Sequence, residues 1–227
     1  MMILLFVASD RMEYAGILAR ASEVRPVALP VDWSRSAKVG GHETLLVANG
    51  VGGERAGAAV AAAVERFHAE AVVSTGFCGA LDERLGVADV VVADWVVAGP
   101  HRYRAAKSTG DRTVYSADHV VQTAEEKRQL RESGACAVEM EAAGVAARAE
   151  MSRLPFYCIK SVTDLAGETM ANDFNSALRA DGHFDTMLIL RRVLRHPTER
   201  LPELLRLRNR CTRAARALGD FLADCRF

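Results

Sequence analysis

The sequence predicts an α/β fold with three layers, α/β/α, around a central mixed, mostly parallel sheet, because two patterns alternate along it. Runs of strand length that are apolar throughout indicate strands buried on both faces. Between them lie segments whose apolar residues have helical spacing. The 227 residues are enough for one domain with a substantial core. We therefore expect a single domain over residues 1–227, with a helical C-terminal extension over 183–227 packed on it.

The N-terminal third is predicted to start with a buried strand and a helix. Residues 3–8 are apolar throughout but too few to span a membrane, and residues 12–21 have helical spacing. The next apolar run, 44–48, leads through the glycine-rich turn 49–53 into an alanine-rich segment, 54–67. Because alanine has the highest helix propensity, that segment is expected to be a helix.

The middle of the chain is expected to continue the alternation of strand and helix. Residues 71–75 are apolar and enter Gly-Phe-Cys-Gly-Ala, which indicates a strand followed by a glycine turn at 76–79. The long β-branched run 87–97 is typical of a buried strand. A short strand is expected at 113–115 and a helix at 124–132. Surface loops are expected at 30–41 and 99–112.

The last core elements surround the segment Val-Glu-Met-Glu-Ala-Ala at 138–143. Residues 135–138 indicate a strand that gives way to a helix over 142–151, and residues 155–162 indicate a final core strand. The polar stretch 165–182 is long for a connection and is a candidate lid. Two helices, 183–195 and 198–224, are expected beyond it. They are separated at Pro197, because proline breaks the interior of a helix.

Charge and cysteine content narrow the class of protein. The chain has 29 Lys and Arg and 29 Asp and Glu, but residues 191–227 hold ten Arg against four acidic residues, so the tail is basic. The five cysteines are scattered without Cys-x-x-Cys spacing, which argues for reduced thiols and against a zinc site or disulfides. The first residues lack the positive stretch of a signal peptide. We therefore expect a cytoplasmic protein.

Three of the predicted strands end near a carboxylate, although each such residue alone is unremarkable. These carboxylates are Glu13, with Asp10 nearer the strand, Glu141 with its neighbour Glu139, and Asp164. Because parallel strands bring their carboxyl ends to one edge of a sheet, the three groups are expected to share a crevice. One carboxylate can hold the paired hydroxyls of a ribose, a protonated one can donate to a leaving group, and a third can accept a proton from water. This set describes the cleavage of a nucleoside's glycosidic bond.

Five segments resemble, in order, the motifs of the purine nucleoside phosphorylase and methylthioadenosine/adenosylhomocysteine nucleosidase superfamily. They are Leu-Val-Ala-Asn-Gly-Val-Gly (46–52), Ser-Thr-Gly-Phe-Cys-Gly-Ala-Leu (74–81), Gly-Val-Ala-Asp-Val-Val-Val-Ala-Asp (86–94), Val-Glu-Met-Glu-Ala-Ala (138–143) and Ser-Val-Thr-Asp (161–164). The resemblance covers about residues 1–190, and Val-Glu-Met-Glu-Ala is its most specific part. Residues 173–175, 180–182 and 197–205 further resemble the hopanoid-associated phosphorylase-like branch.

The resemblance implies cleavage of the N-glycosidic bond of an adenosine with a 5′ substituent, without cofactor or metal. Glu141 would bind the ribose 2′ and 3′ hydroxyls, with Met140 packed against the sugar. Asp164 would protonate the purine at N7, and Glu13 would activate water. The other substrate-binding positions are Glu139, Thr75, Gly76, Phe77, Thr163, His119 and Val120. Glu139 stays open between a substrate contact and a residue that only satisfies backbone donors.

The nucleophile can be argued from charge. Phosphorylases of the superfamily supply an Arg before the second glycine-rich turn and a Ser within it, where this chain has Ser74 and Phe77. A second phosphate-binding Arg is replaced by Glu13, which would repel an anion. Water is therefore the favoured nucleophile. A phosphate-dependent phosphorylase remains the alternative, because Arg55 lies beside a glycine turn at a helix start that could hold phosphate.

Further alternatives concern the base and the class of protein. Nucleosidases of this group commonly stack an aromatic residue on the purine, but residues 117–121 hold none, so His119 either stacks there or is a surface residue. A dinucleotide-binding reading of Gly50–Gly53 is disfavoured, because the next strand ends in Ser-Thr-Gly without the required acid. A nucleoside-binding protein without turnover is the alternative from another class.

The basic tail, residues 191–227, indicates what the protein could contact. Its leucines recur at helical spacing, so one stripe is expected to pack on the body or on another subunit of a homo-oligomer. The lack of aromatics and of a recognition motif argues against nucleic acid. A basic amphipathic helix can also lie on an anionic membrane, which makes peripheral membrane contact a hypothesis.

Overall fold

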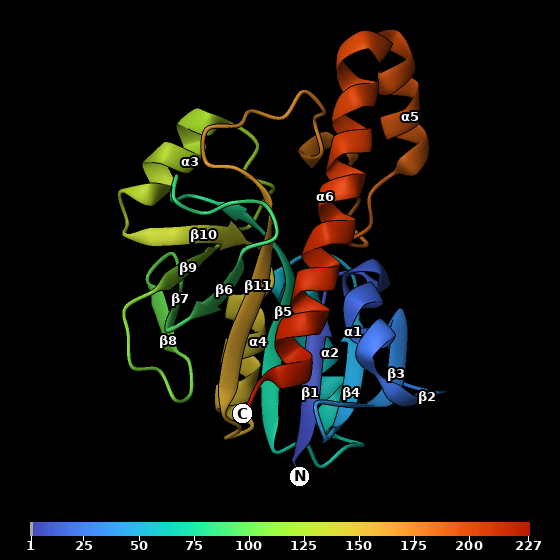
Figure 1. The fold of residues 1–227 in the computed structure, drawn as a ribbon, viewed down its shortest axis with the longest axis vertical. Coiled ribbons are helices and arrows are strands. Elements are labelled where there is room, and N and C mark those ends of the chain that lie inside the picture. Colours follow the sequence, from blue (N-terminus) through green and yellow to red (C-terminus); the bar gives the residue numbers. More distant parts are fainter. Residues whose placement is uncertain (1) are drawn as a thin grey trace.

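The sheet is organised around β5 (Ala71–Ala80), which pairs with three other strands. The structure is a computed structural model that describes residues 2–227. β1 (Ile3–Ala8) and β11 (Phe156–Asp164) run parallel to β5 on either side. β10 (Ala135–Glu139) pairs antiparallel with the last residues of β5. The sheet of eleven strands follows the order β2-β3-β4-β1-β5-β10-β9-β7-β8, and β11 connects β5 to β6 (Figure 1).

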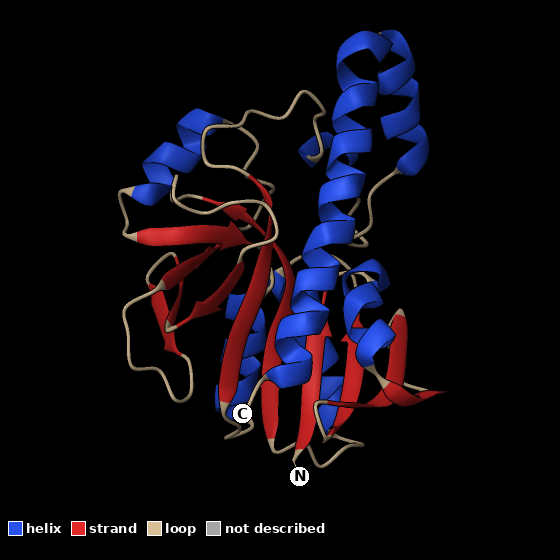
Figure 2. Ribbon diagram, viewed as in Figure 1, coloured by secondary structure: helices blue, strands red, loops and turns tan. Residues whose placement is uncertain are grey.

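Helices cover both faces of this sheet, and antiparallel strands extend it (Figure 2). The other strands are β2 (Ser22–Pro26), β3 (Trp33–Val39), β4 (His42–Ala48), β6 (Val90–Ala93), β7 (Trp95–Ala98), β8 (His101–Arg104) and β9 (Thr113–Ser116). The helices are α1 (Ala15–Arg20), α2 (Gly53–Val64), α3 (Ala124–Arg131), α4 (Ala142–Met151), α5 (Thr186–Arg195) and α6 (Pro197–Asp224), with 3₁₀ turns at Arg11–Tyr14 and Asn175–Ala177. The expected three-layer α/β fold with a mixed sheet is confirmed. The strands β4–β1–β5–β11 are parallel, whereas the pairs β2–β3, β3–β4, β7–β8, β6–β11 and β5–β10 are antiparallel.

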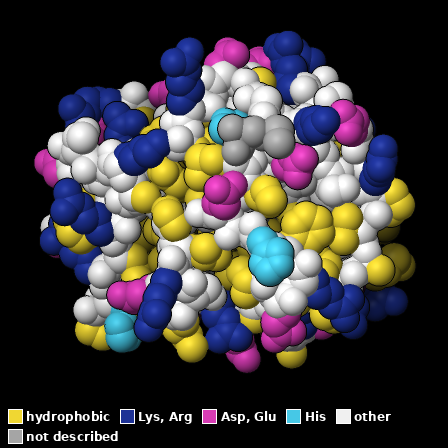
Figure 3. Space-filling view, turned by 90° about the horizontal axis from the view of Figure 1, so that it is seen from below, with side chains coloured by type: hydrophobic (Ala, Val, Ile, Leu, Met, Phe, Trp, Pro, Cys, Tyr) yellow, Lys and Arg dark blue, Asp and Glu magenta, His cyan; other side chains and the backbone are white. Residues whose placement is uncertain are grey.

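The two chain termini lie at the amino ends of the central strands (Figure 1). The face of the molecule at that end carries both signs of charge scattered among hydrophobic side chains (Figure 3). The carboxyl ends of β1, β5 and β11 point to the other end of the sheet. Ligands of open α/β sheets bind at the carboxyl ends of strands, so that end is where a site is expected.

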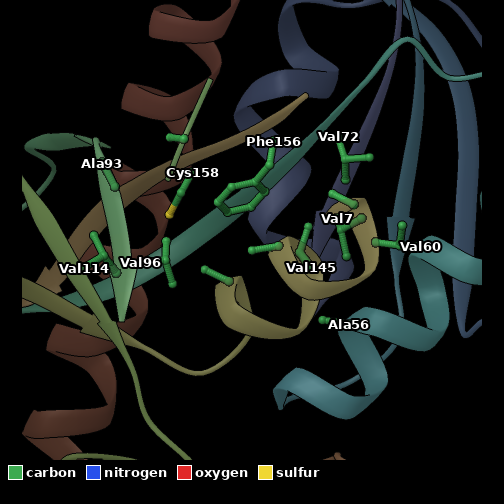
Figure 4. Packing of buried hydrophobic residues seen from close by; sticks show 14 of the residues in the cluster. Val7, Ala56, Val60, Val72, Ala93, Val96, Val114, Val145, Phe156 and Cys158 are labelled. Carbon is green, nitrogen blue, oxygen red and sulfur yellow. The ribbon is translucent and has the colours of Figure 1, made fainter. Parts of the chain in front are cut away.

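Alternate residues of β1 divide the core into two halves. Leu5 and Val7 point to one face, where they pack with α2 and α4 (Figure 4). Leu4 and Phe6 point to the other face and pack with α1 and α6. This alternation is the geometry of a strand whose two faces are both covered, and it explains why the run is apolar throughout.

Close packing of α2 on α4 depends on a glycine, which leads to a stability prediction. A Cβ added at Gly144 would lie 1.8 Å from the backbone oxygen of Gly53. The two helix backbones must move apart to make room for this Cβ, so Gly144→Ala is expected to lower the free energy of unfolding by about 3 kcal/mol. Gly167→Ala is the control, because an added Cβ there meets nothing within 4 Å. Urea unfolding of both variants measures the difference, and equal midpoints would contradict it.

The C-terminal helices form where the sequence predicts them. Pro197 is the first residue of α6, a position where the missing N–H costs nothing. The second half of α6 packs on the body through Leu218 and Leu222. The first half pairs with α5 in a hairpin that stands away from the sheet (Figure 1). Within residues 2–227, every helix is too short or too polar to cross a lipid bilayer.

Two segments predicted to be loops contain strands instead. The segment 30–41 holds β3, which pairs antiparallel with β4 through a turn at Gly40 and Gly41, both with positive φ. The segment 99–112 holds β8, paired with β7. β3 lies near the end of the sheet and β8 at its edge, and both carry several polar residues, so neither has the apolar run that marks a central strand.

Two other boundaries differ because single residues redirect the chain. The run 87–97 is two strands, β6 and β7, because the Asp94 carboxylate between them accepts hydrogen bonds from Ser108 Oγ and from the N–H groups of Gly110 and Arg112. The predicted glycine turn at 76–79 is instead the second half of β5. Gly76 has a φ of +117°, which bends the strand without ending it.

Candidate active site

A cavity of about 470 Å³ lies at the carboxyl ends of β1, β5, β10 and β11. The residues predicted from sequence that line it are Glu13, Phe77, His119, Val120, Glu139, Met140, Glu141, Thr163 and Asp164. Thr75 and Gly76 lie behind this wall within β5, and Thr75 is 1% exposed. The three strand-end carboxylates thus share one crevice, as expected. Parallel strands bring Glu13 and Asp164 there, whereas Glu141 follows β10, which runs antiparallel to β5 and pairs only with its last residues, so for Glu141 the expected parallel geometry is wrong.

Glu13 lies within the 3₁₀ turn Arg11–Tyr14, and four donors hold its carboxylate. Its Oε2 accepts from Ser9 N (2.8 Å), Ser9 Oγ (2.9 Å) and Asp10 N (3.1 Å). Its Oε1 accepts from Phe77 N at 2.8 Å. These donors form a pocket for a negative group, and the protein's own carboxylate fills it. Oε1, with one protein donor, still has a lone pair for another.

Gly76 is required beside this carboxylate. A Cβ at position 76 would lie 2.5 Å from Glu13 Oε1, so any larger residue would displace Glu13. Thr75 contributes its carbonyl oxygen, which accepts from Lys160 Nζ at 3.1 Å. β5 therefore shapes the site with backbone groups at 75 and 76, while Phe77 presents both its N–H and its side chain.

Glu139 and Glu141 share a buried lysine but have different partners. The Glu139 carboxylate accepts from the backbone N–H groups of Glu141 and Ala142, at 3.0 and 2.8 Å, at the start of α4. Lys160 Nζ lies 2.8 Å from Glu139 Oε2 and 3.6 Å from Glu141 Oε2. Glu141 Oε1 accepts from Gly52 N at 3.2 Å. Glu139 is thus engaged with the helix start and Lys160, whereas Glu141 has fewer protein partners and faces the cavity.

The charges of this cluster are shifted by its burial. Burial raises the pKa of Glu141 to about 7, since desolvation outweighs the attraction of Lys160, and the nearby charges of Glu139 and Glu13 add to the rise. For Lys160, burial favours the neutral form, but Glu139 and Glu141 outweigh it and raise its pKa above the ordinary value. Lys160 therefore stays an ammonium that holds the two carboxylates together.

Asp164 is held from two sides at the end of β11. Its Oδ2 lies 2.5 Å from Nζ of Lys127, a lysine of α3 whose side chain is fully buried. Its Oδ1 lies 3.0 Å from Thr163 Oγ1. A Cβ at Gly79 would come within 2.7 Å of Oδ2, so β5 leaves space for the carboxyl here.

The segment 116–122 passes over the cavity and is tied to the stretch predicted to be a lid. Asn175 Oδ1 accepts from Val120 N, and Asn175 Nδ2 donates to Val120 O, both at 2.8 Å. Phe174 N donates to Gln122 Oε1 at 2.6 Å. His119 lies at the rim, half-exposed, between Glu126 and Asp118, and its hydrogen bonds to these carboxylates raise its pKa. The 165–182 stretch is therefore fixed against the segment that carries His119 and Val120.

One end of the cavity is apolar and was missed by sequence reasoning. The residues of its walls come from the 165–182 stretch and the α5–α6 hairpin, and all but Arg208 are apolar. These residues are Met170, Phe174, Phe184, Ile189, Leu204, Leu207 and Arg208. The helical spacing of the leucines indicated that α6 packs on something, but not that one of its faces borders a cavity.

The comparisons with known proteins concern the family and the fold. The family model of the phosphorylase superfamily matches residues 34–120 and 109–189. A 5′-methylthioadenosine/S-adenosylhomocysteine nucleosidase of Staphylococcus saprophyticus is 28% identical over 158 residues, which cover 55% of this chain and 69% of the relative. A nucleosidase of the same description from Staphylococcus epidermidis is 24% identical over 163 residues, covering 57% and 72%.

Solved structures share the fold over nearly the whole chain. The 5′-methylthioadenosine/S-adenosylhomocysteine nucleosidase of S. pneumoniae, with the transition-state inhibitor MT-ImmA, has a TM-score of 0.70 at 19% identity and covers 98% of this chain and 99% of its own. The futalosine hydrolase of Helicobacter pylori has a TM-score of 0.74 at 17% identity, with 98% and 96% covered. At these identities the likeness concerns the fold.

Proposed function

Since the chain belongs to the phosphorylase superfamily, we propose that it is a purine nucleosidase, which cleaves the N-glycosidic bond of a 5′-substituted adenosine with water and releases adenine. The curated relatives described above are nucleosidases, which are N-glycosyl hydrolases. The cavity combines three carboxylates at strand ends with an apolar end, which suits a ribose, a leaving base and a 5′ substituent.

The observation that carries hydrolysis is the position of Glu13. A phosphate at the strand end would need the N–H groups of Ser9, Asp10 and Phe77, but the Glu13 carboxylate already accepts from all three. A second anion would therefore lose its donors and be repelled. Arg55, which kept phosphorolysis open, lies outside the cavity, with Nη1 at 3.4 Å from Asn49 O. Both facts favour water.

The proposed reaction assigns one step to each carboxylate. Glu141, held by Gly52 N and Lys160, accepts hydrogen bonds from the ribose hydroxyls beside Met140. Asp164 gives a proton to N7 as the bond between C1′ and N9 breaks and its electron pair moves to the purine. Glu13 Oε1 takes a proton from the water whose oxygen bonds to C1′. One nucleoside and one water thus give adenine and the free sugar.

Release of adenine with and without phosphate tests this proposal. We expect release from 5′-methylthioadenosine in phosphate-free buffer, with no faster rate when phosphate is added, because Glu13 occupies the donors a phosphate would need. Strict dependence on phosphate would make the protein a phosphorylase. Binding without release under either condition would make it a nucleoside-binding protein.

The raised pKa of Glu141 predicts how nucleoside binding depends on pH. The ionised carboxylate accepts from the ribose hydroxyls with both oxygens, whereas the protonated form turns one oxygen into a donor, and the pKa of Glu141 is about 7. The affinity for a 5′-substituted 7-deazaadenosine, whose base lacks N7, should therefore rise about tenfold between about pH 6 and about pH 8. Adenine alone, which has no ribose, is the matched ligand and should show no such rise. Calorimetric titration measures both, and a Glu141→Gln variant that kept the pH dependence would contradict the assignment.

The same shift has a consequence for stability. The folded-state pKa of about 7 lies above the ordinary value of 4.5, so the folded protein binds a proton that the unfolded chain has lost between these values. The contribution of Glu141 to stability therefore declines as pH rises from about 4.5 to about 7. A bound nucleoside offsets this loss, since it stabilises the ionised form.

The apolar end of the cavity supports a 5′ substituent of hydrophobic character. Phe174, Ile189 and Leu207 offer apolar surface there, and Arg208 adds one cation at its rim. A longer apolar substituent buries more of this surface, at about 25 cal/mol per Å². The resemblance to the hopanoid-associated branch stays a prediction.

The outer face of the α5–α6 hairpin supports contact with an anionic membrane. Met187, Leu190 and Leu194 are exposed at helical spacing on α5, and Leu201 and Leu205 are exposed on α6. Exposed arginines flank them, among them Arg191, Arg195 and Arg206. Two copies meeting through this face would bring like charges together, whereas anionic headgroups would neutralise them.

Vesicle binding tests this contact. On vesicles of phosphatidylcholine and phosphatidylglycerol in equal parts, the pair Arg191→Glu and Arg195→Glu should lower partitioning at least tenfold, since each cation near the surface contributes about 1 kcal/mol. The pair Arg25→Glu and Arg66→Glu changes two exposed arginines outside the hairpin and should have little effect. Equal partitioning of both pairs would contradict the contact. A homo-oligomer and a cytoplasmic location stay predictions, which sedimentation and cell fractionation would test.

A further inference from the structure

Lys127 is the one buried residue of α3, and its side chain is fully buried. An amphipathic helix of this kind normally turns a leucine or alanine toward the core. A buried ammonium costs several kcal/mol unless it is paired and hydrogen-bonded. Lys127 Nζ meets this condition with two partners, Asp164 Oδ2 at 2.5 Å and Leu165 O at 2.8 Å.

The contacts of Asp164 leave one oxygen for the reacting proton. Lys127 occupies Oδ2, while Oδ1 is next to Thr163 Oγ1 at 3.0 Å. The Thr163 hydroxyl also lies 3.3 Å from the carbonyl oxygen of Cys78. Its single proton can go to either partner, so Thr163 accommodates Oδ1 both with and without a proton. The contacts of Asp164 therefore suit both its protonated form, before proton transfer, and its ionised form, after proton transfer.

The turn after Asp164 connects this pair to α6. Leu165, whose carbonyl oxygen binds Lys127, donates its N–H to Glu168 Oε2 at 2.9 Å. Arg210 of α6 binds both oxygens of Glu168, at 2.6 and 2.8 Å. Glu168 and Arg210 are thus paired with each other, and Lys127 is the cation in direct contact with Asp164. The position of the carboxyl is fixed by α3 and β11 together.

We propose that Lys127 is the positioning residue of the acid Asp164, an inference that rests on the proposed function. Its ammonium holds Oδ2 and stabilises the carboxylate that remains after the Oδ1 proton has moved to purine N7. The proton leaves Asp164, the C1′–N9 electron pair goes to the purine, and the new negative charge of Asp164 lies beside an ammonium that is already in place. Preorganised charge of this kind acts on the transition state rather than on substrate binding.

A double-mutant cycle tests this role. Lys127→Met removes the ammonium and keeps most of the volume, so kcat should fall 10- to 100-fold while KM changes less than threefold. Lys127→Arg keeps the charge and should retain most of kcat. In an Asp164→Asn background, Lys127→Met should change the residual kcat less than twofold, because its partner is gone. Arg128→Met, on the exposed face of the same helix, is the control and should leave kcat unchanged.

Several results would overturn the proposal. One is an equal loss of kcat from Lys127→Met in both backgrounds, which would mean that the lysine acts only on the fold. Another is a kcat within twofold of the wild type. The melting temperature of each variant checks that it folds. If Lys127→Met does not fold, Lys127→Arg and a double-mutant cycle of Lys127→Gln with Asp164→Asn replace it.

The test separates this inference from the proposed function. If the wild type releases adenine only with phosphate, hydrolysis is wrong, but the same cycle run with phosphate still decides the role of Lys127. Protonation of the departing purine is common to both reactions. Absence of release under both conditions overturns both.

Discussion

Replacing Asp164 with Asn is expected to lower kcat about 10³-fold while the fold persists. A positioned general acid contributes about 10²- to 10⁴-fold to a rate, and a thousandfold loss corresponds to about 4 kcal/mol of transition-state stabilisation. The amide has nearly the same shape and can still accept from Lys127 Nζ, now 2.5 Å from Oδ2, but it has no acidic proton for N7. Steady-state kinetics of adenine release measure the loss.

The split between kcat and KM decides what Asp164 does. KM should change only a few fold, because the proton moves after binding. Asp111→Asn changes an exposed aspartate in the loop before β9 and should leave both constants unaltered. Full activity of Asp164→Asn would refute the assigned acid. A loss that a fall in melting temperature explains would point to a structural role.

Replacing Glu13 is expected to have the second large effect, and it differs between two variants. Glu13→Gln loses the proton acceptor and turns its N–H₂ group either toward Phe77 N or toward the donors of Ser9 and Asp10. We expect kcat to fall about 10²- to 10⁴-fold, with a loss of about 1–3 kcal/mol in stability for each buried donor left unsatisfied. Kinetics and urea unfolding measure the two effects.

Glu13→Ala tests whether this carboxylate occupies an anion site. Truncation frees the N–H groups of Ser9, Asp10 and Phe77, which then point into an empty space. Phosphate should bind there and raise the melting temperature of the variant, while the wild type should not respond, because only binding to the folded state stabilises. Lack of any response in Glu13→Ala would contradict this account of why phosphate is excluded.

The parts of the site that sequence predicts are those with a local pattern. Glu13, Glu141 and Asp164 each come at the end of an apolar strand. Parallel strand geometry places Glu13 and Asp164 on one edge of the sheet, whereas Glu141 reaches the same crevice from β10, which is antiparallel to β5. The resemblance to a family adds their roles. The central strands are equally predictable, because a run such as Leu4–Ala8 is buried on both faces and therefore apolar throughout.

The parts that sequence does not predict depend on residues far apart in the chain. Lysine is seldom fully buried, so nothing in the sequence marks Lys127 or Lys160 as partners of Asp164 and Glu139. β3 was missed because Ser34, Arg35 and Ser36 interrupt its apolar residues, so it has neither an apolar run nor a strict alternation. Asp94 divides one expected strand into two only because a loop about 15 residues later supplies its donors.

Identification of the sugar product in the presence of saturating phosphate tests the central claim most directly. Wild-type protein is incubated with 5′-methylthioadenosine and phosphate, and the products are separated and identified by mass spectrometry. The Glu13 carboxylate fills the donors that phosphate needs, so the account predicts free 5-methylthioribose together with adenine. A sugar 1-phosphate as the main product would contradict it.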